Sequence, residues 1–137
     1  MTVAIGAGTK VVVLLNDGAG SFNAQTPVAT GGKGGIDLVL ADFNNDSVPD
    51  VAVANSTSND VSLLMGNSLG ALAAAKRFAT GTKPSALAVG DFDGDGNLDL
   101  AVTHSVSRFV AVLFGNGSAP GAQFDPRVKI ATPGSKA

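Results

Sequence analysis

The chain has 137 residues, a formal net charge of −2 and 45% hydrophobic residues, which is enough apolar material for the core of one domain. It contains no Cys, which excludes disulfides and thiolate metal sites, and its nine Lys and Arg residues form no basic stripe of the kind that binds nucleic acid. No apolar run is long enough for a membrane span, and the opening residues lack the charged and apolar regions of a signal peptide.

Short strands joined by tight turns are expected along the whole chain. Val, Ala and Leu are abundant, eighteen Gly are present, and apolar runs alternate with turn signals such as Asp17-Gly18. This pattern predicts an all-β protein. The expected strands cover residues 3–5, 10–15, 21–30, 36–41, 50–54, 61–65, 73–80, 86–90, 100–103, 109–114 and 124–132.

Two segments of the sequence match each other at an offset of 49 residues. Residues 42–50 read Asp-Phe-Asn-Asn-Asp-Ser-Val-Pro-Asp, and residues 91–99 read Asp-Phe-Asp-Gly-Asp-Gly-Asn-Leu-Asp. The apolar runs on both sides match as well, and residues 3–18 match the later part of each copy. A period near 50 residues with four strands per copy is typical of the blades of a β-propeller.

The repeat predicts a β-propeller fragment of about 2.75 four-stranded blades. The expected units are a partial blade over residues 1–33 and blades over residues 34–83 and 84–137. Propellers close with about four to eight blades, so two apolar blade faces are expected to lack a neighbour. We therefore expect a homo-oligomer, a dimer that closes a ring of about six blades. The alternative is a piece of a longer propeller.

The two matching loops hold seven of the eleven acidic residues, and the chain has no Glu. Their oxygen donors fall at positions one, three, five, seven and nine, and Ca²⁺ binds about six to eight oxygens at roughly 2.3–2.6 Å. A bound dication also removes the repulsion among neighbouring carboxylates. The predicted ligands are Asp42, Asn44, Asp46, the Val48 carbonyl and Asp50 in one loop, and Asp91, Asp93, Asp95, the Asn97 carbonyl and Asp99 in the other.

These loops differ from the helical calcium loop, which closes with Glu at position twelve. Position twelve is Val53 or Val102 here, so a strand–loop–strand setting is expected. A decorated hairpin turn without metal is the alternative for one loop alone, and two loops in register favour metal binding. The first loop has Asn44 and Ser47 where the second has Asp and Gly, so we expect weaker binding there and backbone strain at Ser47 of about 1 kcal/mol.

On the residues of these two loops, the sequence resembles the FG-GAP (VCBS-type) repeat family, whose calcium-binding blades also form the propeller head of integrin α chains. Residues 114–120, Phe-Gly-Asn-Gly-Ser-Ala-Pro, further resemble the motif that gives the family its name. The resemblance implies that calcium is held on one face of the disc by the loop between the first and second strands of each blade. It also implies an extracellular or cell-surface location.

The same resemblance places ligands on the opposite face, on loops at residues 55–60, 103–108, 31–35 and 81–85. The candidate contacts for a protein or glycan ligand are Asn55, Asn59, His104 and Arg108. A non-catalytic binding or adhesion module, or a self-assembling scaffold, is the expected function. A fragment of a polysaccharide-active enzyme is the alternative, although the aspartates assigned to metal leave no acid–base pair for hydrolysis.

Overall fold

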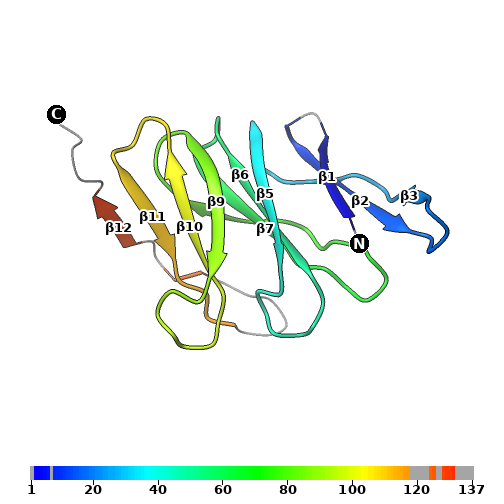
Figure 1. Cartoon of the computed structure of the whole chain (residues 1–137). Helices are drawn as coiled ribbons and strands as arrows, with labels where there is room; N and C mark the ends of the chain where they lie inside the picture. The colour runs from blue at the N-terminus through cyan, green and yellow to red at the C-terminus, as the bar shows by residue number, and fades with distance from the viewer. Residues whose placement is uncertain (1, 7, 118–123, 126–127, 132–137) are drawn as a thin grey trace.

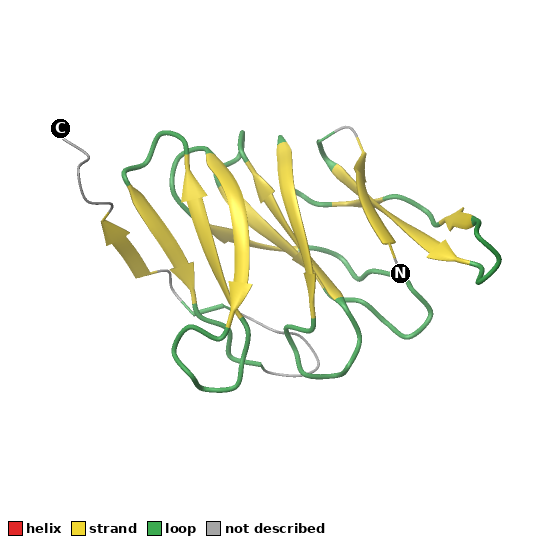
Figure 2. Cartoon of the chain, viewed as in Figure 1, coloured by secondary structure: helices red, strands yellow, loops and turns green. Residues whose placement is uncertain are grey.

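The computed structural model describes residues 2–6, 8–117, 124–125 and 128–131. Within these residues every regular element is a strand, and no helix is long and apolar enough to cross a membrane. The strands form three antiparallel sheets that lie side by side (Figures 1 and 2). The all-β prediction is confirmed, and the arrangement is consistent with propeller-like blades. The last residues of the Gly-Ser-Ala-Pro segment, 118–120, lie outside the described residues.

Each sheet is a set of short strands joined by turns. The first contains β1 (Thr2–Gly6), β2 (Lys10–Asn16), β3 (Phe22–Ala24) and β4 (Val28–Ala29). The second contains β5 (Gly35–Ala41), β6 (Asp50–Asn55), β7 (Asp60–Leu64) and β8 (Lys76–Ala79). The third contains β9 (Pro84–Gly90), β10 (Asp99–His104), β11 (Phe109–Leu113) and β12 (Val128–Ala131). In the second and third sheets, each strand pairs with the next one in sequence.

The first sheet differs from the other two. β1 matches β6 and β10 in sequence and pairs with β2, so no described strand holds the place that β5 and β9 hold in their sheets. The single strand expected over residues 21–30 is wrong: β3 and β4 pair separately with β2. Pro27 lies in the gap between them, and Pro has no N–H to continue a hydrogen-bond ladder.

The outer strands of the second and third sheets are also shorter than expected. The segment predicted as residues 73–80 is regular only in β8, and it is preceded by an isolated bridge between Gly66 and Leu72. The third sheet repeats this arrangement with a bridge between Gly115 and Phe124 before β12. Residues 126–127 and 132 of the last predicted strand lie outside the described residues. Each outer segment therefore begins against the end of the preceding strand and forms its ladder only later.

The larger apolar core lies between the second and third sheets. Phe43 from the loop after β5 and Leu63 of β7 pack there with Leu100 of β10. The ring of Phe124 meets Phe43 and Phe78 edge to face, with ring centroids 5.6 Å and 5.1 Å apart, a favoured aromatic geometry. This core fixes the third sheet against the second, and with it the relative position of the two acidic loops.

A smaller core lies between the first and second sheets. Val11 of β2 packs there with Val51 and Val53 of β6. Ala52 of β6 points the other way, into the larger core. All six residues of β6 are buried, because the second sheet is covered on both faces. Coverage on both faces explains why β6 is apolar at consecutive positions instead of alternating.

Candidate metal centre

The two acidic loops occupy equivalent places in the second and third sheets. Residues 42–49 connect β5 to β6 and residues 91–98 connect β9 to β10. Both loops lie at the same end of the molecule, at the lower edge of Figure 2. They also touch, because Nδ2 of Asn45 donates a 3.0 Å hydrogen bond to Oδ1 of Asn97. The strand–loop–strand setting expected from the sequence is therefore confirmed.

In the loop at residues 91–99, backbone N–H groups converge on the carboxylate of Asp91. Its Oδ1 accepts hydrogen bonds from the N–H of Gly94 (2.8 Å) and Asp95 (3.1 Å), and its Oδ2 accepts one from Gly96 (2.9 Å). Gly94 and Gly96 have φ angles of 75° and 89°, which residues with a Cβ rarely adopt. The aspartate at position one and the glycines at positions four and six together curl the loop.

The aspartate at position nine lies beneath this curl. Asp99 is fully buried, and its Oδ2 accepts a 2.8 Å hydrogen bond from the N–H of Phe92. Its Oδ1 accepts a 2.9 Å hydrogen bond from the N–H of Gly115, which follows β11. A Cβ on Gly115 would overlap the carbonyl oxygen of Leu98, so only Gly brings this N–H close enough. One carboxylate thus joins the loop to the end of the third strand of its sheet.

The same arrangement occurs in the loop at residues 42–50. Asp50 is fully buried and accepts hydrogen bonds from the N–H of Phe43 (2.8 Å) and Gly66 (2.9 Å). A Cβ on Gly66 would overlap the carbonyl oxygen of Pro49. Burial raises the pKa of Asp50, and the nearby carboxylates of the loop add to the effect while the two N–H donors oppose it. The charged form of Asp50 therefore costs free energy when no cation is near.

The carboxylates of Asp91, Asp93 and Asp99 come together as one group. One oxygen from each lies within 4.8 Å of the other two, and among the described residues no other set of three acidic, His or Cys side chains meets this condition. Oxygens bound to one Ca²⁺ at 2.3–2.6 Å cannot be more than about 5 Å apart. The spacing therefore fits a single calcium ion, and the donor set, carboxylate oxygen only, suits a hard cation.

Opposite pKa shifts distinguish the two middle carboxylates of this loop. Partial desolvation and the charges of Asp95 and Asp99 raise the pKa of Asp93. The N–H groups of Asn97 lower the pKa of Asp95, with its backbone N–H donating at 2.8 Å and its side-chain amide at 3.1 Å. Asp93 is thus the carboxylate whose charge lacks compensation from the protein.

The loop at residues 42–50 has the same outline with fewer charges. Asp42 accepts hydrogen bonds from the N–H of Asp46 (3.1 Å) and Ser47 (2.7 Å), as Asp91 does in the other loop. At position three, the amide of Asn44 donates a 2.9 Å hydrogen bond to Asp46. Position three is therefore an uncharged hydrogen-bond donor to a carboxylate in this loop, where the other loop has the charged Asp93. The first loop has less need of a cation and offers it less charge.

Backbone conformation separates the loops further. Positions four and six are Asn45 and Ser47, with φ angles of 59° and 67°, where the other loop has glycines. The strained conformation expected at Ser47 is confirmed. Asn tolerates this region better than most residues, whereas Ser gains no comparable relief. Both loops therefore have the same backbone shape at positions four and six, and in the first loop this shape costs conformational free energy.

The comparison with known protein families agrees with this geometry. The family model for the FG-GAP-like repeat matches residues 2–53 and residues 42–102. The chain belongs to the FG-GAP-like repeat family. FG-GAP repeats are β-propeller-like repeat modules and are generally non-catalytic. No curated protein and no solved structure matches the chain.

Asn55 is an internal residue. It was one of the four ligand contacts expected at the end of the sheets opposite the acidic loops. Its side chain is fully buried, and its amide nitrogen donates to Asp60 and to the hydroxyl of Ser62, both at 2.8 Å. The expectation that it lies on a ligand face is wrong, because its side chain is buried against β7 at the end of β6. Gly32 lies so close to this amide that a Cβ there would overlap it.

His104 ends β10 as Asn55 ends β6, and it also holds the fold together. Its Nε2 accepts a 2.8 Å hydrogen bond from the N–H of Gly81. A ring nitrogen that accepts this bond carries no proton, so Nδ1 carries it and donates to the carbonyl oxygen of Phe109 at 3.1 Å. His104 is half-buried and joins the segment between β8 and β9 to β11, so its ring nitrogens are not available to a ligand.

The other two expected contacts are at the surface. Asn59 and Arg108 are both exposed. Oδ1 of Asn59 accepts a 2.8 Å hydrogen bond from the N–H of Lys83, and its φ angle is 61°. Asn59 also borders a hollow of about 500 Å³ at this end of the sheets. The polar or charged residues that line the hollow are Ser58, Asn59, Thr80, Thr82, Ser107 and Lys129.

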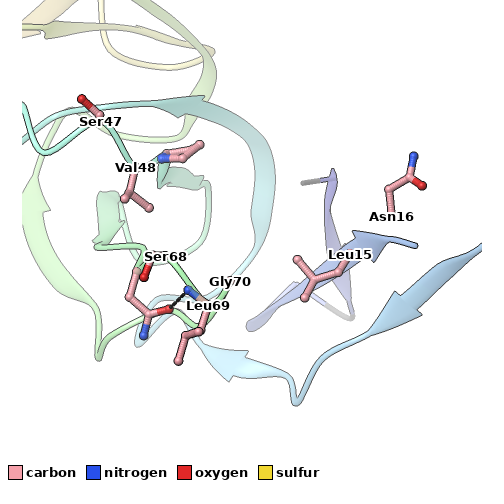
Figure 3. Close-up of a pocket in the computed structure, with 9 residues that line it drawn as sticks. Leu15, Asn16, Ser47, Val48, Ser68, Leu69 and Gly70 are labelled. Atoms are coloured by element: carbon pink, nitrogen blue, oxygen red, sulfur yellow. Dashed lines mark hydrogen bonds between the residues drawn. The ribbon is translucent and has the colours of Figure 1, made fainter. Parts of the chain in front are cut away.

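A second hollow, of about 480 Å³, lies beside the first acidic loop (Figure 3). Leu15 of β2 points across it toward the turn that carries Leu69 and Gly70, and Val48 of the acidic loop forms another wall. On the corresponding side of the loop at residues 91–99, Asn97 instead meets Asn45 of the neighbouring acidic loop. The hollow thus lies between the first acidic loop and the first sheet, which has no described counterpart of β5 and β9.

The two glycines that donate to Asp50 and Asp99 were not identified as site residues from the sequence. Gly66 and Gly115 recur at the same place of the repeat, each followed by Asn. A Gly-Asn pair reads as a turn signal, so the recurrence alone does not show that its N–H supports an acidic loop. The signal that could have found them is that Gly66 and Gly115 are 49 residues apart, as Asp50 and Asp99 are.

Proposed function

We propose that this chain is a calcium-binding propeller repeat module in which the ion has a structural role. The observation that carries the proposal is the group formed by Asp91, Asp93 and Asp99, whose oxygens lie within 4.8 Å of one another. Asp91 and Asp93 are exposed and Asp99 is buried, so an ion could enter from solvent and rest on the base of the loop.

The protein's own residues prepare the loop for the cation. Asp91 holds the loop backbone closed and Asp99 anchors it to the end of β11, so both oxygens of each already accept an N–H. Oδ1 of Asp91 accepts two N–H groups, whereas Oδ2 of Asp91 and both oxygens of Asp99 accept one each and keep a second lone pair for a metal. Ca²⁺ supplies positive charge that offsets the repulsion among the carboxylates. Binding therefore stabilises the folded loop, and calcium modules of this kind bind at about 10⁻⁴–10⁻³ M.

Calorimetric titration of the chelator-treated protein with CaCl₂ tests the proposal. We expect saturable binding in that range and a higher Tm with calcium. Asp93→Ala should remove binding at this loop. Asp125→Ala is the matched control, because Asp125 is exposed and lies outside both loops, and it should bind as the unaltered chain does. Absence of binding at millimolar calcium would reject the proposal.

The loop at residues 42–50 is proposed as a weaker site with Asp42, Asn44, Asp46, the Val48 carbonyl and Asp50 as ligands. Its amide at position three and the positive φ angles of Asn45 and Ser47 disfavour tight binding relative to the loop at residues 91–99. Asp91→Ala should therefore lower the tighter component of the titration, and Asp42→Ala the weaker one. An equal loss of affinity from both variants would contradict this ranking.

We further propose that the module is non-catalytic and holds a glycan in the hollow beside Asn59. Neutral hydroxyl and amide groups line this hollow together with the ring of Phe109, and Nζ of Lys129 lies 4.9 Å from the centre of that ring. Hydroxyl and amide groups beside an aromatic ring are groups with which a protein can orient a small polar ligand. A glycan array probed with the calcium-loaded protein should show bound glycans that Asn59→Ala loses and Asn23→Ala, an exposed control, retains. An array with no bound glycan would reject this part.

A further inference from the structure

One face of the third sheet is apolar and open. It forms a hollow of about 430 Å³ with almost no polar surface. Phe92 and Ile130 are 51% and 53% exposed there. The residues that line it are Phe92, Ala101, Val110, Val112, Phe114 and Ile130. Large apolar side chains gathered at the surface mark a place where another surface packs.

The repeat shows what kind of surface that is. Each lining residue has a counterpart in the second repeat unit, and for five of them the counterpart lies 49 residues earlier in the sequence. The counterpart of Ile130 is Phe78, because Ile130 pairs with Val110 as Phe78 pairs with Val61. These counterparts all belong to the larger core, where the third sheet covers them. They are Phe43, Ala52, Val61, Leu63, Met65 and Phe78. The open face is thus built to be covered by another sheet of the same kind.

One face of the first sheet corresponds to the face with which the second and third sheets each cover the sheet before them. Leu113 of β11 and Leu64 of β7 point toward the preceding sheet and are buried in the two cores. Leu14 of β2 holds the corresponding position, and no described sheet precedes it, so it is only half-buried. Phe22 pairs with Asn16 and therefore lies on the same face as Leu14, where it is 52% exposed.

We propose that the open face of the third sheet binds a second copy of this chain, head to tail, through the free face of that copy's first sheet. The contact would repeat the part of the packing between the second and third sheets that β10 and β11 supply, because no described strand of the first sheet holds the place of β9. Because the two faces are different, the association is heterologous, and it either closes into a ring or continues. Two copies supply six sheets, within the range of about four to eight at which propellers close.

Size-exclusion chromatography with light scattering on the whole chain at micromolar concentration tests this. The expected result is a mass of two chains. Ile130→Asp, an exposed change on edge strand β12, should give the mass of one chain, and so should Phe22→Asp on the other face. Val106→Asp is the matched control, because Val106 is 56% exposed in a turn outside both faces. Circular dichroism should show the same strand content in all four proteins.

Mixing the two monomeric variants distinguishes head-to-tail from symmetric association. Ile130→Asp keeps an intact first-sheet face and Phe22→Asp keeps an intact third-sheet face, so the mixture should regain a mass of two chains. If Phe22→Asp remains dimeric, or the mixture stays monomeric, the head-to-tail arrangement is overturned. If the unaltered chain is monomeric throughout, these faces are not covered by a second copy and the proposal is overturned. Calcium titration is scored separately, so either result leaves the metal proposal untouched.

Discussion

Replacing the buried aspartate of the second loop by its amide separates the structural role of that residue from metal binding. Asp99 accepts one N–H on each oxygen, from Phe92 and from Gly115. Asp99→Asn has nearly the same shape but can offer an oxygen to only one of them. Its amide nitrogen then faces the other N–H, and a buried donor loses its acceptor.

The magnitude follows from the bond that is lost. A hydrogen bond to a charged acceptor contributes about 1.5–3 kcal/mol, and leaving a buried donor unsatisfied costs about 1–3 kcal/mol. We expect Asp99→Asn to lower the free energy of unfolding by about 3 kcal/mol and the Tm by about 10 °C. This loss should be present in chelator, because both hydrogen bonds are made within the protein.

Urea denaturation in chelator measures the effect, and Asp93→Asn is its control. Asp93 is exposed and accepts one hydrogen bond, at 3.2 Å, which an amide oxygen can keep. The control should therefore be at least as stable as the unaltered chain in chelator, because it removes a charge that Asp95 and Asp99 repel, while it loses calcium affinity. The reasoning is refuted if Asp99→Asn is as stable as the unaltered chain in chelator, or if its destabilisation is seen only when calcium is present.

Three further predictions follow from the loops. Ser47→Gly should raise the free energy of unfolding in chelator by about 0.5–1 kcal/mol, because the φ angle of 67° suits Gly; a lower value in urea denaturation would contradict it. Gly115→Ala should lower the free energy of unfolding by about 2 kcal/mol or more, since a Cβ would overlap the Leu98 carbonyl and displace the N–H that donates to Asp99; an unchanged Tm would show that the close approach is not required. Calcium affinity should fall on acidification from a pH above 3.8, the ordinary pKa of Asp, because the raised pKa of Asp93 lets protons compete with the ion earlier; calorimetry showing constant affinity down to about pH 4 would disagree.

The fold could be predicted largely because the sequence repeats. A match at 49 residues fixes the order of strands and places both acidic loops between the first two strands of a sheet, independently of any local propensity. The break between β3 and β4 was missed although Pro27 signals it, because the apolar residues on both sides suggested one strand. A break within a strand depends on whether one residue has an N–H group to donate, and the pattern of apolar residues does not report this.

The candidate site was predictable in its composition but not in its contacts. Carboxylates at alternate positions identify the loop, and the left-handed position of Ser47 follows from its match to Gly96. By contrast, Asn55 and His104 looked like surface residues because polar turns follow them. Their burial depends on the segments that connect one sheet to the next, where Gly32 and Gly81 leave room for these side chains. Only the packing of sheet on sheet shows that these polar groups serve the fold.

The most direct measurement is anomalous diffraction from crystals of this chain grown in millimolar calcium. The account predicts an anomalous peak bonded to oxygens of Asp91, Asp93 and Asp99 at about 2.3–2.6 Å. A second, weaker peak is predicted in the loop at residues 42–50. Both loops empty at that calcium concentration, with the carboxylates of Asp91, Asp93 and Asp99 turned away from one another, would contradict it.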